Sequence, residues 1–196
     1  MNLRLAIIAL AVPASLAAQP PAPTPFQLAN PVTTAFRGRI MTMHRNIAQA
    51  FDSIPASKFD YKPTPAQLTI GYIAQHVAND NYLFCNNFGA AKANLAAEDT
   101  ATADSVKAKW PKAKLVSKLK DSFAFCQTAL GQLNDAALSE TITLTFGTRT
   151  QQRPRVAMVL GHALDLADHY SQLANYMRLN NILPPTALPR SGRGGN

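Results

Sequence analysis

The sequence predicts an all-α protein, a four-helix bundle that follows a cleaved signal peptide. Three observations support this fold class. Apolar residues recur at helical spacing in four long segments, polar or Pro-punctuated stretches separate those segments, and a short apolar run stands at the extreme N-terminus. The bundle is expected to span residues 30–185.

The first 18 residues have the composition of a signal peptide. A basic start, Met1–Arg4, precedes the apolar run of residues 5–14, and the small residues at 15–18 offer a cleavage site. The apolar run is shorter than the roughly 20 residues that a membrane helix needs. We therefore expect a periplasmic or secreted protein, and no later segment of the sequence could span a bilayer.

The segments that flank the predicted bundle are expected to be unstructured. Residues 19–29 are Pro-rich and predict an extended linker, whereas residues 186–196 are rich in Gly and Arg and predict a disordered tail. The formal net charge is +8, but the sequence holds no dense Lys/Arg run with interleaved aromatic residues. A solvated basic surface is thus favoured over a nucleic-acid interface.

The first two helices are expected over residues 30–51 and 69–88. Each has an apolar stripe at helical spacing, formed by Phe36, Ile40, Met43, Ile47 and Phe51 in the first and by Ile70, Ile73, Val77, Phe84 and Phe88 in the second. His44 borders the first stripe, where a lone histidine is more often structural than functional. His76 borders the second stripe, and Asp80 follows four residues later on the same side.

The second half of the chain predicts two more helices around one extended segment. A long linker, residues 89–111, leads into a third helix over residues 112–133. Residues 141–146 alternate polar and apolar side chains, which predicts an extended segment that packs as a loop over one bundle end. Pro154 should lie in the first turn of the fourth helix, and residues 159–185 read as one continuous helix.

A polar stripe borders the core stripe of the fourth helix. Its members follow one another at intervals of three and four residues, so they project from one face: His162, Asp165, His169, Gln172 and Tyr176. Inward imidazole and carboxylate groups cost free energy unless they are paired or bound to a metal. With His76 facing this stripe, the pattern predicts either a divalent-metal site or a hydrogen-bonded polar layer without metal.

The predicted metal ligands are His76, Asp165 and His169, with His162 as a fourth ligand or proton shuttle. Two imidazoles and a carboxylate suit Zn²⁺ and are acceptable to Ni²⁺ or Fe²⁺. Gln172 and Tyr176 would orient a substrate or a water molecule. The bound cation would activate water or hold an incoming thiolate.

The two cysteines, Cys85 and Cys126, fall on different predicted helices. In an oxidising compartment they could form a disulfide, and the alternative is a pair of buried apolar thiols.

Two phrases resemble the DinB-like family, bacterial four-helix-bundle metalloproteins. They are GYIAQHVANDNYLFC in the second helix and DHYSQLANYMRLNNILPP in the fourth, the latter similar to the family ending H-x-G-Q-L-x-x-Y-L-R-x-x-G-x-x-P-P. Members of that family hold a divalent metal with one second-helix His and an H-x-x-x-H pair on the fourth helix. The resemblance implies His76 and His169 as ligands and puts Asp165 at the middle position, where the family has His.

The resemblance implies a metal-dependent hydrolase or thiol-S-transferase that acts on an unknown small molecule. The alternative is a non-catalytic envelope binding or stress protein whose metal site has degenerated, which the substitution at Asp165 favours modestly. Export counts against a transferase, because low-molecular-weight thiol cofactors are scarce outside the cytosol. The sequence leaves a homodimer open.

Overall fold

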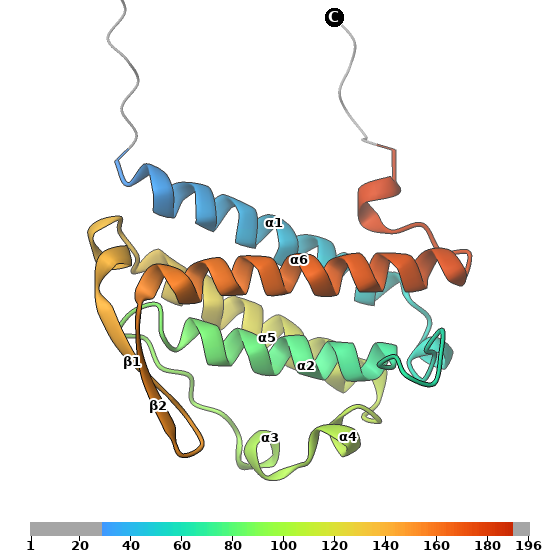
Figure 1. Ribbon diagram of the computed structural model, residues 1–196. Helices are drawn as coiled ribbons and strands as arrows, with labels where there is room; N and C mark the ends of the chain where they lie inside the picture. Colours follow the sequence, from blue (N-terminus) through green and yellow to red (C-terminus); the bar gives the residue numbers. More distant parts are fainter. Residues whose placement is uncertain (1–28, 190–196) are drawn as a thin grey trace, which may run out of the picture.

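The computed structural model describes residues 29–189. The predicted signal peptide and most of the predicted linker, together with residues 190–196 of the predicted tail, lie outside the described residues. Four long helices make up the body of the protein (Figure 1): α1 (Pro31–Ser53), α2 (Ile70–Cys85), α5 (Lys112–Gly131) and α6 (Arg155–Leu179). No helix within 29–189 is long and apolar enough to cross a membrane.

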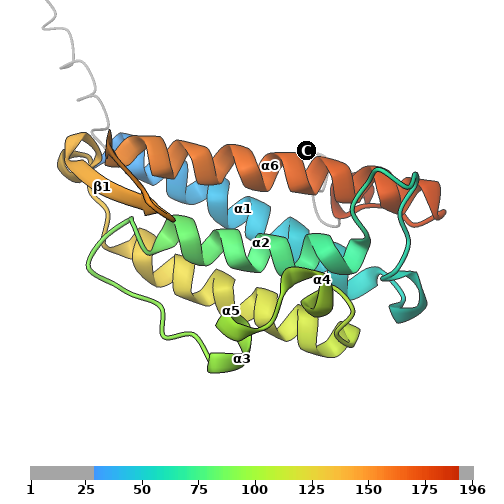
Figure 2. The ribbon, with the colours of Figure 1, turned by 60° about the horizontal axis from the view of Figure 1, so that its bottom comes forward.

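The four long helices form a ring in which each contacts two others. α1 packs against α6 and α5, and α2 packs against α5 and α6. Figures 1 and 2 show that α1 and α6 run in one direction and that α2 and α5 run in the other. The interior is filled by aliphatic and aromatic side chains from all four helices, including Ile40, Phe51, Ile73, Leu119, Leu166 and Leu173. The predicted four-helix bundle is therefore confirmed.

The extended segment predicted over residues 141–146 is confirmed, but the expectation that it packs as an isolated loop was wrong. The segment is β1 (Thr141–Phe146), and it forms an antiparallel hairpin with β2 (Arg149–Pro154). Leu144 is buried, but every residue of β2 is exposed, so the second strand carries no alternation that its sequence could reveal. Gly147, at φ 59°, provides the left-handed turn that reverses the chain.

The limits of α6 also differ from the expectation. Pro154 is the last residue of β2 and the N-cap residue of α6, so it precedes the first turn of the helix instead of lying within it. At the other end Asn181 is left-handed, at φ 58°. The amide of Asn181 donates to Arg178 O at 3.0 Å and that of Ile182 to Met177 O at 2.9 Å, which is the hydrogen-bond pattern of a Schellman motif. Asn181 thus ends a helix that the apolar pattern alone extends to residue 185.

The chain remains ordered beyond the predicted bundle limit at Pro185. Residues Pro185–Ala187 form a 3₁₀ turn, and the amide of Thr186 donates to the Tyr170 hydroxyl at 3.1 Å. The Thr186 hydroxyl lies 2.9 Å from the same oxygen. The predicted tail therefore begins with a turn that is held against α6.

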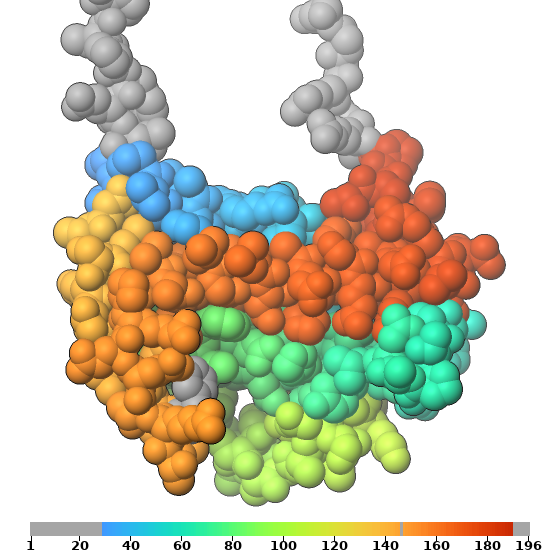
Figure 3. Space-filling view, viewed as in Figure 1, coloured from blue at the N-terminus to red at the C-terminus, as the bar shows by residue number. Residues whose placement is uncertain are grey.

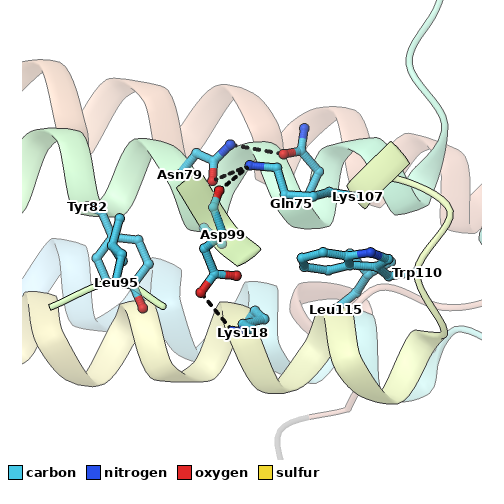
Figure 4. Close-up of a pocket in the computed structure, with 10 residues that line it drawn as sticks. Gln75, Asn79, Tyr82, Leu95, Asp99, Lys107, Trp110, Leu115 and Lys118 are labelled. Carbon is cyan, nitrogen blue, oxygen red and sulfur yellow. Dashed lines mark hydrogen bonds and ion pairs between the residues drawn. The ribbon is translucent and has the colours of Figure 1, made fainter. Parts of the chain in front are cut away.

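The crossover between α2 and α5 carries two short helices, α3 (Ala97–Ala101) and α4 (Asp104–Lys107), where the sequence predicted a plain linker. The buried Lys107 ammonium holds the crossover in place, donating to Asn79 Oδ1 at 3.3 Å and Asp99 O at 3.1 Å (Figure 4). It also pairs with Asp104 at 2.8 Å. These three acceptors use all three ammonium hydrogens. The small pocket drawn in Figure 4 thus belongs to the contact that fixes the crossover against α2.

Candidate metal centre

The candidate centre lies where α2 and α6 run side by side in opposite directions, along the seam visible in Figure 3. His76 Nε2 lies 3.1 Å from Asp80 Oδ2 on α2, and His169 Nε2 lies 3.4 Å from Asp165 Oδ1 on α6. Each pair is four residues apart, so both members project from one helix face. Because the helices are antiparallel, the two pairs meet His to His and Asp to Asp.

Three of the four side chains, those of His76, Asp80 and His169, converge closely enough to surround a single ion, and Asp165 contacts His169 from its own helix. The rings of His76 and His169 meet edge-on with centroids 4.9 Å apart. One ligand atom from each of His76, Asp80 and His169 lies within 4.8 Å of the others, which makes these residues a group that could hold a metal ion. His169 is buried, whereas the His76 side chain is 33% exposed, so the centre reaches the surface on the α2 side.

Burial and a neighbouring carboxylate perturb Asp80. Loss of hydration raises the pKa of Asp80 to about 6, with Asp165 acting in the same direction and His76 in the opposite one. Burial is the largest single influence on His169 and would lower its pKa, but the hydrogen bond to Asp165, together with the negative charges of Asp165, Asp80 and Asp168, raises the pKa overall. Two carboxylates held together in partial burial are costly, and a bound cation would relieve that cost.

Two polar atoms of the centre are buried without a hydrogen-bond partner, Asp165 Oδ2 and His169 Nδ1. Unpaired buried polar atoms are uncommon in folded proteins and call for a ligand or an ordered water. Two imidazoles and two carboxylates are also a donor set that Zn²⁺ and related divalent cations accept. The residues present therefore fit a divalent cation.

Not all of the residues predicted for the site are brought together. His76 and His169 meet and Asp165 contacts His169, but the group whose ligand atoms lie within 4.8 Å of one another contains Asp80 in place of Asp165. His162 lies two helical turns from His169 and faces a different layer of the core. Tyr176 is fully buried, edge-on to Tyr61 at 6.1 Å between centroids, and burial raises the pKa of its hydroxyl. Gln172 lies beside Tyr176 and is partly buried.

The predicted ligand set omitted Asp80. Its signal was present in the sequence, because His76 and Asp80 repeat in reverse order the spacing of Asp165 and His169. Two such pairs on antiparallel helices form a symmetric group of four. The relative direction of the two helices, which the sequence does not state, decides whether the second carboxylate reaches the centre.

A second polar layer lies in the closed core, and all four long helices contribute to it. The structure joins Cys85 on α2 to Cys126 on α5 in a disulfide with Cα atoms 5.2 Å apart. His162 lies beside it, with Nδ1 4.0 Å from Cys85 Sγ and Nε2 2.8 Å from Asn81 Oδ1. His44 completes the layer, stacked on a neighbouring ring and edge-on to His162 at 5.6 Å.

Comparisons with known proteins bear on both the fold and the centre. Residues 39–173 match the model of the DinB superfamily. A DinB-like protein from Bacillus cereus superposes with a TM-score of 0.59 at 14% identity, covering 78% of this chain and 95% of that one. A conserved protein from Enterococcus faecalis gives 0.55 at 17% identity over 76% and 96% of the two chains.

The mycothiol-dependent maleylpyruvate isomerase has the same fold, with a TM-score of 0.57 at 14% identity. The match covers 72% of this chain but only 60% of the isomerase. No curated protein matches the sequence significantly. The family match extends over most of α1, all of α2 and α5 and most of α6, and it includes all four residues of the candidate centre. The chain therefore belongs to the DinB superfamily.

Proposed function

We propose that this protein is an exported metal-dependent enzyme whose centre is formed by His76, Asp80, Asp165 and His169. The observation that carries the proposal is the convergence of His76, Asp80 and His169, from α2 and α6, on one partly exposed point, with Asp165 against His169. The raised pKa of Asp80 and the unpartnered atoms of Asp165 and His169 add support. A cation would stabilise the ionised form of Asp80 and would give the unpartnered atoms a positively charged neighbour. Zn²⁺ suits this donor set best.

The four side chains would divide the work of binding and proton transfer. When bound, a divalent cation supplies Lewis acidity, which makes water or a thiol a stronger nucleophile near neutral pH. Asp165 holds the ring of His169 in place through its contact with Nε2. Asp80, with a pKa of about 6, can accept a proton near neutrality when it is not a ligand. The exposed edge of His76 gives the substrate its approach.

A hydrolase is the function that this geometry supports most directly, because it requires only the centre and water. A thiol-S-transferase is the second candidate, favoured by the structural similarity to an isomerase that depends on mycothiol. The Cys85–Cys126 disulfide supports the proposed export, since such bonds persist in oxidising compartments. Fractionation of the cells that produce the chain would test that part of the proposal.

The metal content of the purified chain is the first test. We expect about one Zn²⁺ per chain by elemental analysis, and loss of that ion in both His76→Ala and His169→Ala. Asp168→Ala is the matched control, because this exposed carboxylate lies on the same helix beside His169. Comparison of Asp80→Ala with Asp165→Ala identifies which carboxylate completes the ligand set. A wild-type chain that takes up no Zn²⁺ would show that only the scaffold has been retained.

A thiol titration separates the two reaction classes. The double variant Cys85→Ala/Cys126→Ala has no protein thiol, so any thiolate bound to Co²⁺ in its centre must come from solution. A charge-transfer band that grows with an added low-molecular-weight thiol favours the transferase. Hydrolysis of activated ester or amide substrates, dependent on metal and unaffected by thiol, favours the hydrolase.

A further inference from the structure

The layer around the disulfide contains a histidine with no partner. His44 is 3% exposed, and neither of its ring nitrogens has a hydrogen-bond partner within the described residues. A buried imidazole without any hydrogen bond costs free energy that packing against the Phe123 ring recovers only in part. Burial lowers the pKa of His44 to about 3, so its ring is neutral and carries a free lone pair.

The tautomer of His162 follows from the hydrogen bonds around it. Ser122 donates its hydroxyl to Leu119 O at 2.7 Å, so its oxygen accepts from Asn81 Nδ2 at 2.8 Å. This orients Asn81 with Oδ1 toward His162, where it accepts from Nε2 at 2.8 Å. His162 therefore carries its proton on Nε2, and the bare Nδ1 faces the cysteines, 4.0 Å from Cys85 Sγ.

The arrangement of His162 and Asn81 is typical of a metal ligand and its support. Metal-binding histidines donate the N–H that faces away from the ion to a fixed carbonyl or carboxylate, as His162 does to Asn81. One ligand atom from each of His44, Cys126 and His162 lies within 4.8 Å of the others. Tetrahedral zinc, with bonds of about 2.0–2.3 Å, sets its ligands roughly 3.3–3.8 Å apart, so small side-chain movements suffice.

We propose that this layer is a second metal site that the disulfide keeps closed: reduction of the Cys85–Cys126 bond lets Cys126, His44 and His162 bind Zn²⁺, with Cys85 within reach as the fourth ligand. In the oxidised protein both sulfurs are bonded to each other, and neither is a thiolate. The site is separate from the centre between α2 and α6, with which it shares no residue.

The reaction balances with a dithiol as the reductant. The dithiol passes two electrons and two protons to the disulfide, breaking the S–S bond to leave two cysteine thiols and the oxidised reductant. Each thiol that then binds Zn²⁺ releases one proton to solvent. Two thiolates and two neutral imidazoles form the ligand set of many structural zinc sites. The bound zinc would thus replace the disulfide as the cross-link between α2 and α5, and it would also link α1 and α6.

The test uses the full chain with His76→Ala and His169→Ala in place, so that the first centre cannot contribute. In that background Cys85→Ala frees the Cys126 thiol without any reductant. We expect it to bind one Co²⁺ with a thiolate-to-metal charge-transfer band. The matched control, Cys85→Ala/Cys126→Ala, lacks the same disulfide but has no thiol and should show no band. Adding His44→Leu to Cys85→Ala should weaken Co²⁺ binding at least about tenfold.

A second measurement keeps the proposal testable if Cys85→Ala does not fold. Zn²⁺ should raise the thermal midpoint of the His76→Ala/His169→Ala chain after treatment with a dithiol, and should leave the oxidised chain unchanged. The proposal is overturned by a folded Cys85→Ala chain that gives no charge-transfer band. It is also overturned if Zn²⁺ affects the reduced and oxidised chains equally. Neither result bears on the first centre, which this background lacks.

Discussion

The imidazole rings of His76 and His169 meet edge-on, with centroids 4.9 Å apart, and each has an aspartate one turn along its own helix. The contact joins two helices through histidines that are more than 90 positions apart in the chain. Whatever ion the centre binds will therefore also link α2 to α6. Substitution of a metal ligand in this centre should therefore change the free energy of unfolding in opposite directions in the metal-free and the metal-bound chain.

Asp80→Asn should stabilise the metal-free chain at neutral pH. The folded-state pKa of Asp80 is raised to about 6, so its contribution to stability is full below the unfolded pKa and is lost as pH rises through 6. At pH 7 the ionised group is unfavourable, and we expect the variant to gain about 1 kcal/mol after allowance for solvent screening. Urea unfolding with a chelator measures this gain, which should vanish near pH 4.

With Zn²⁺ present the order of the two proteins should reverse, because the wild-type chain gains binding free energy that Asp80→Asn loses. Asp168→Asn replaces an exposed carboxylate of α6 and should change neither value. Equal stabilisation of wild type and Asp80→Asn by Zn²⁺ would exclude Asp80 from the ligand set.

Gly71→Ala should destabilise the fold by about 1–3 kcal/mol. A Cβ at this position in α2 would overlap the backbone carbonyl oxygen of Ala108, which cannot withdraw without moving the end of α4. Gly38→Ala is the matched control, because it lies in α1 with open space around it and should stabilise by roughly 0.5–1 kcal/mol. Chemical denaturation of both variants gives the comparison, and similar values for the two would contradict the predicted overlap.

The sequence predicts the helices and part of the centre because both depend on local spacing. His76 and His169 are identified by helical periodicity and by the two family phrases. His162 lies on the same polar stripe as Asp165, so helical periodicity cannot exclude it from the centre. Its hydrogen bond to Asn81 on α2 shows that it belongs to the layer around the disulfide instead. The hairpin escaped prediction because Arg149–Pro154 has no buried face. The spacing of residues within one segment does not reveal which distant segment it contacts.

Asp135→Ala should lower the thermal midpoint by several degrees at neutral pH. The Asp135 carboxylate accepts from the amides of Val32 and Thr33, at 3.1 and 2.7 Å, and so caps the start of α1 from a distant loop. Although desolvation acts in the opposite direction, these bonds hold the pKa of Asp135 below its usual value.

The cap should weaken in acid. An acid with a lowered folded-state pKa stabilises above its unfolded pKa, and that contribution is lost as pH falls through the folded value. The difference between wild type and Asp135→Ala should therefore shrink as the pH falls below the usual range of an aspartate. Asp60→Ala, on an exposed turn, is the control. A pH-independent difference would mean that packing, not charge, accounts for the effect.

Reduction of the disulfide should lower the free energy of unfolding by about 4 kcal/mol in the absence of metal. The cysteines are separated by 41 positions, and the cross-link restricts a loop of that size in the unfolded chain. Denaturation with and without a phosphine reductant measures the change. The Cys85→Ala/Cys126→Ala chain should not respond to the reductant, and a response there would reveal an effect unrelated to the bond.

The disulfide also has a consequence for proteolysis. It joins the two ends of the segment that contains α3 and α4, so a protease that cuts once between residues 86 and 125 produces two fragments that stay covalently connected. Such a nicked protein would run as one band on a non-reducing gel and as two after reduction. Its helices would remain assembled in the bundle, and damage to this outer crossover would not by itself release either half of the protein.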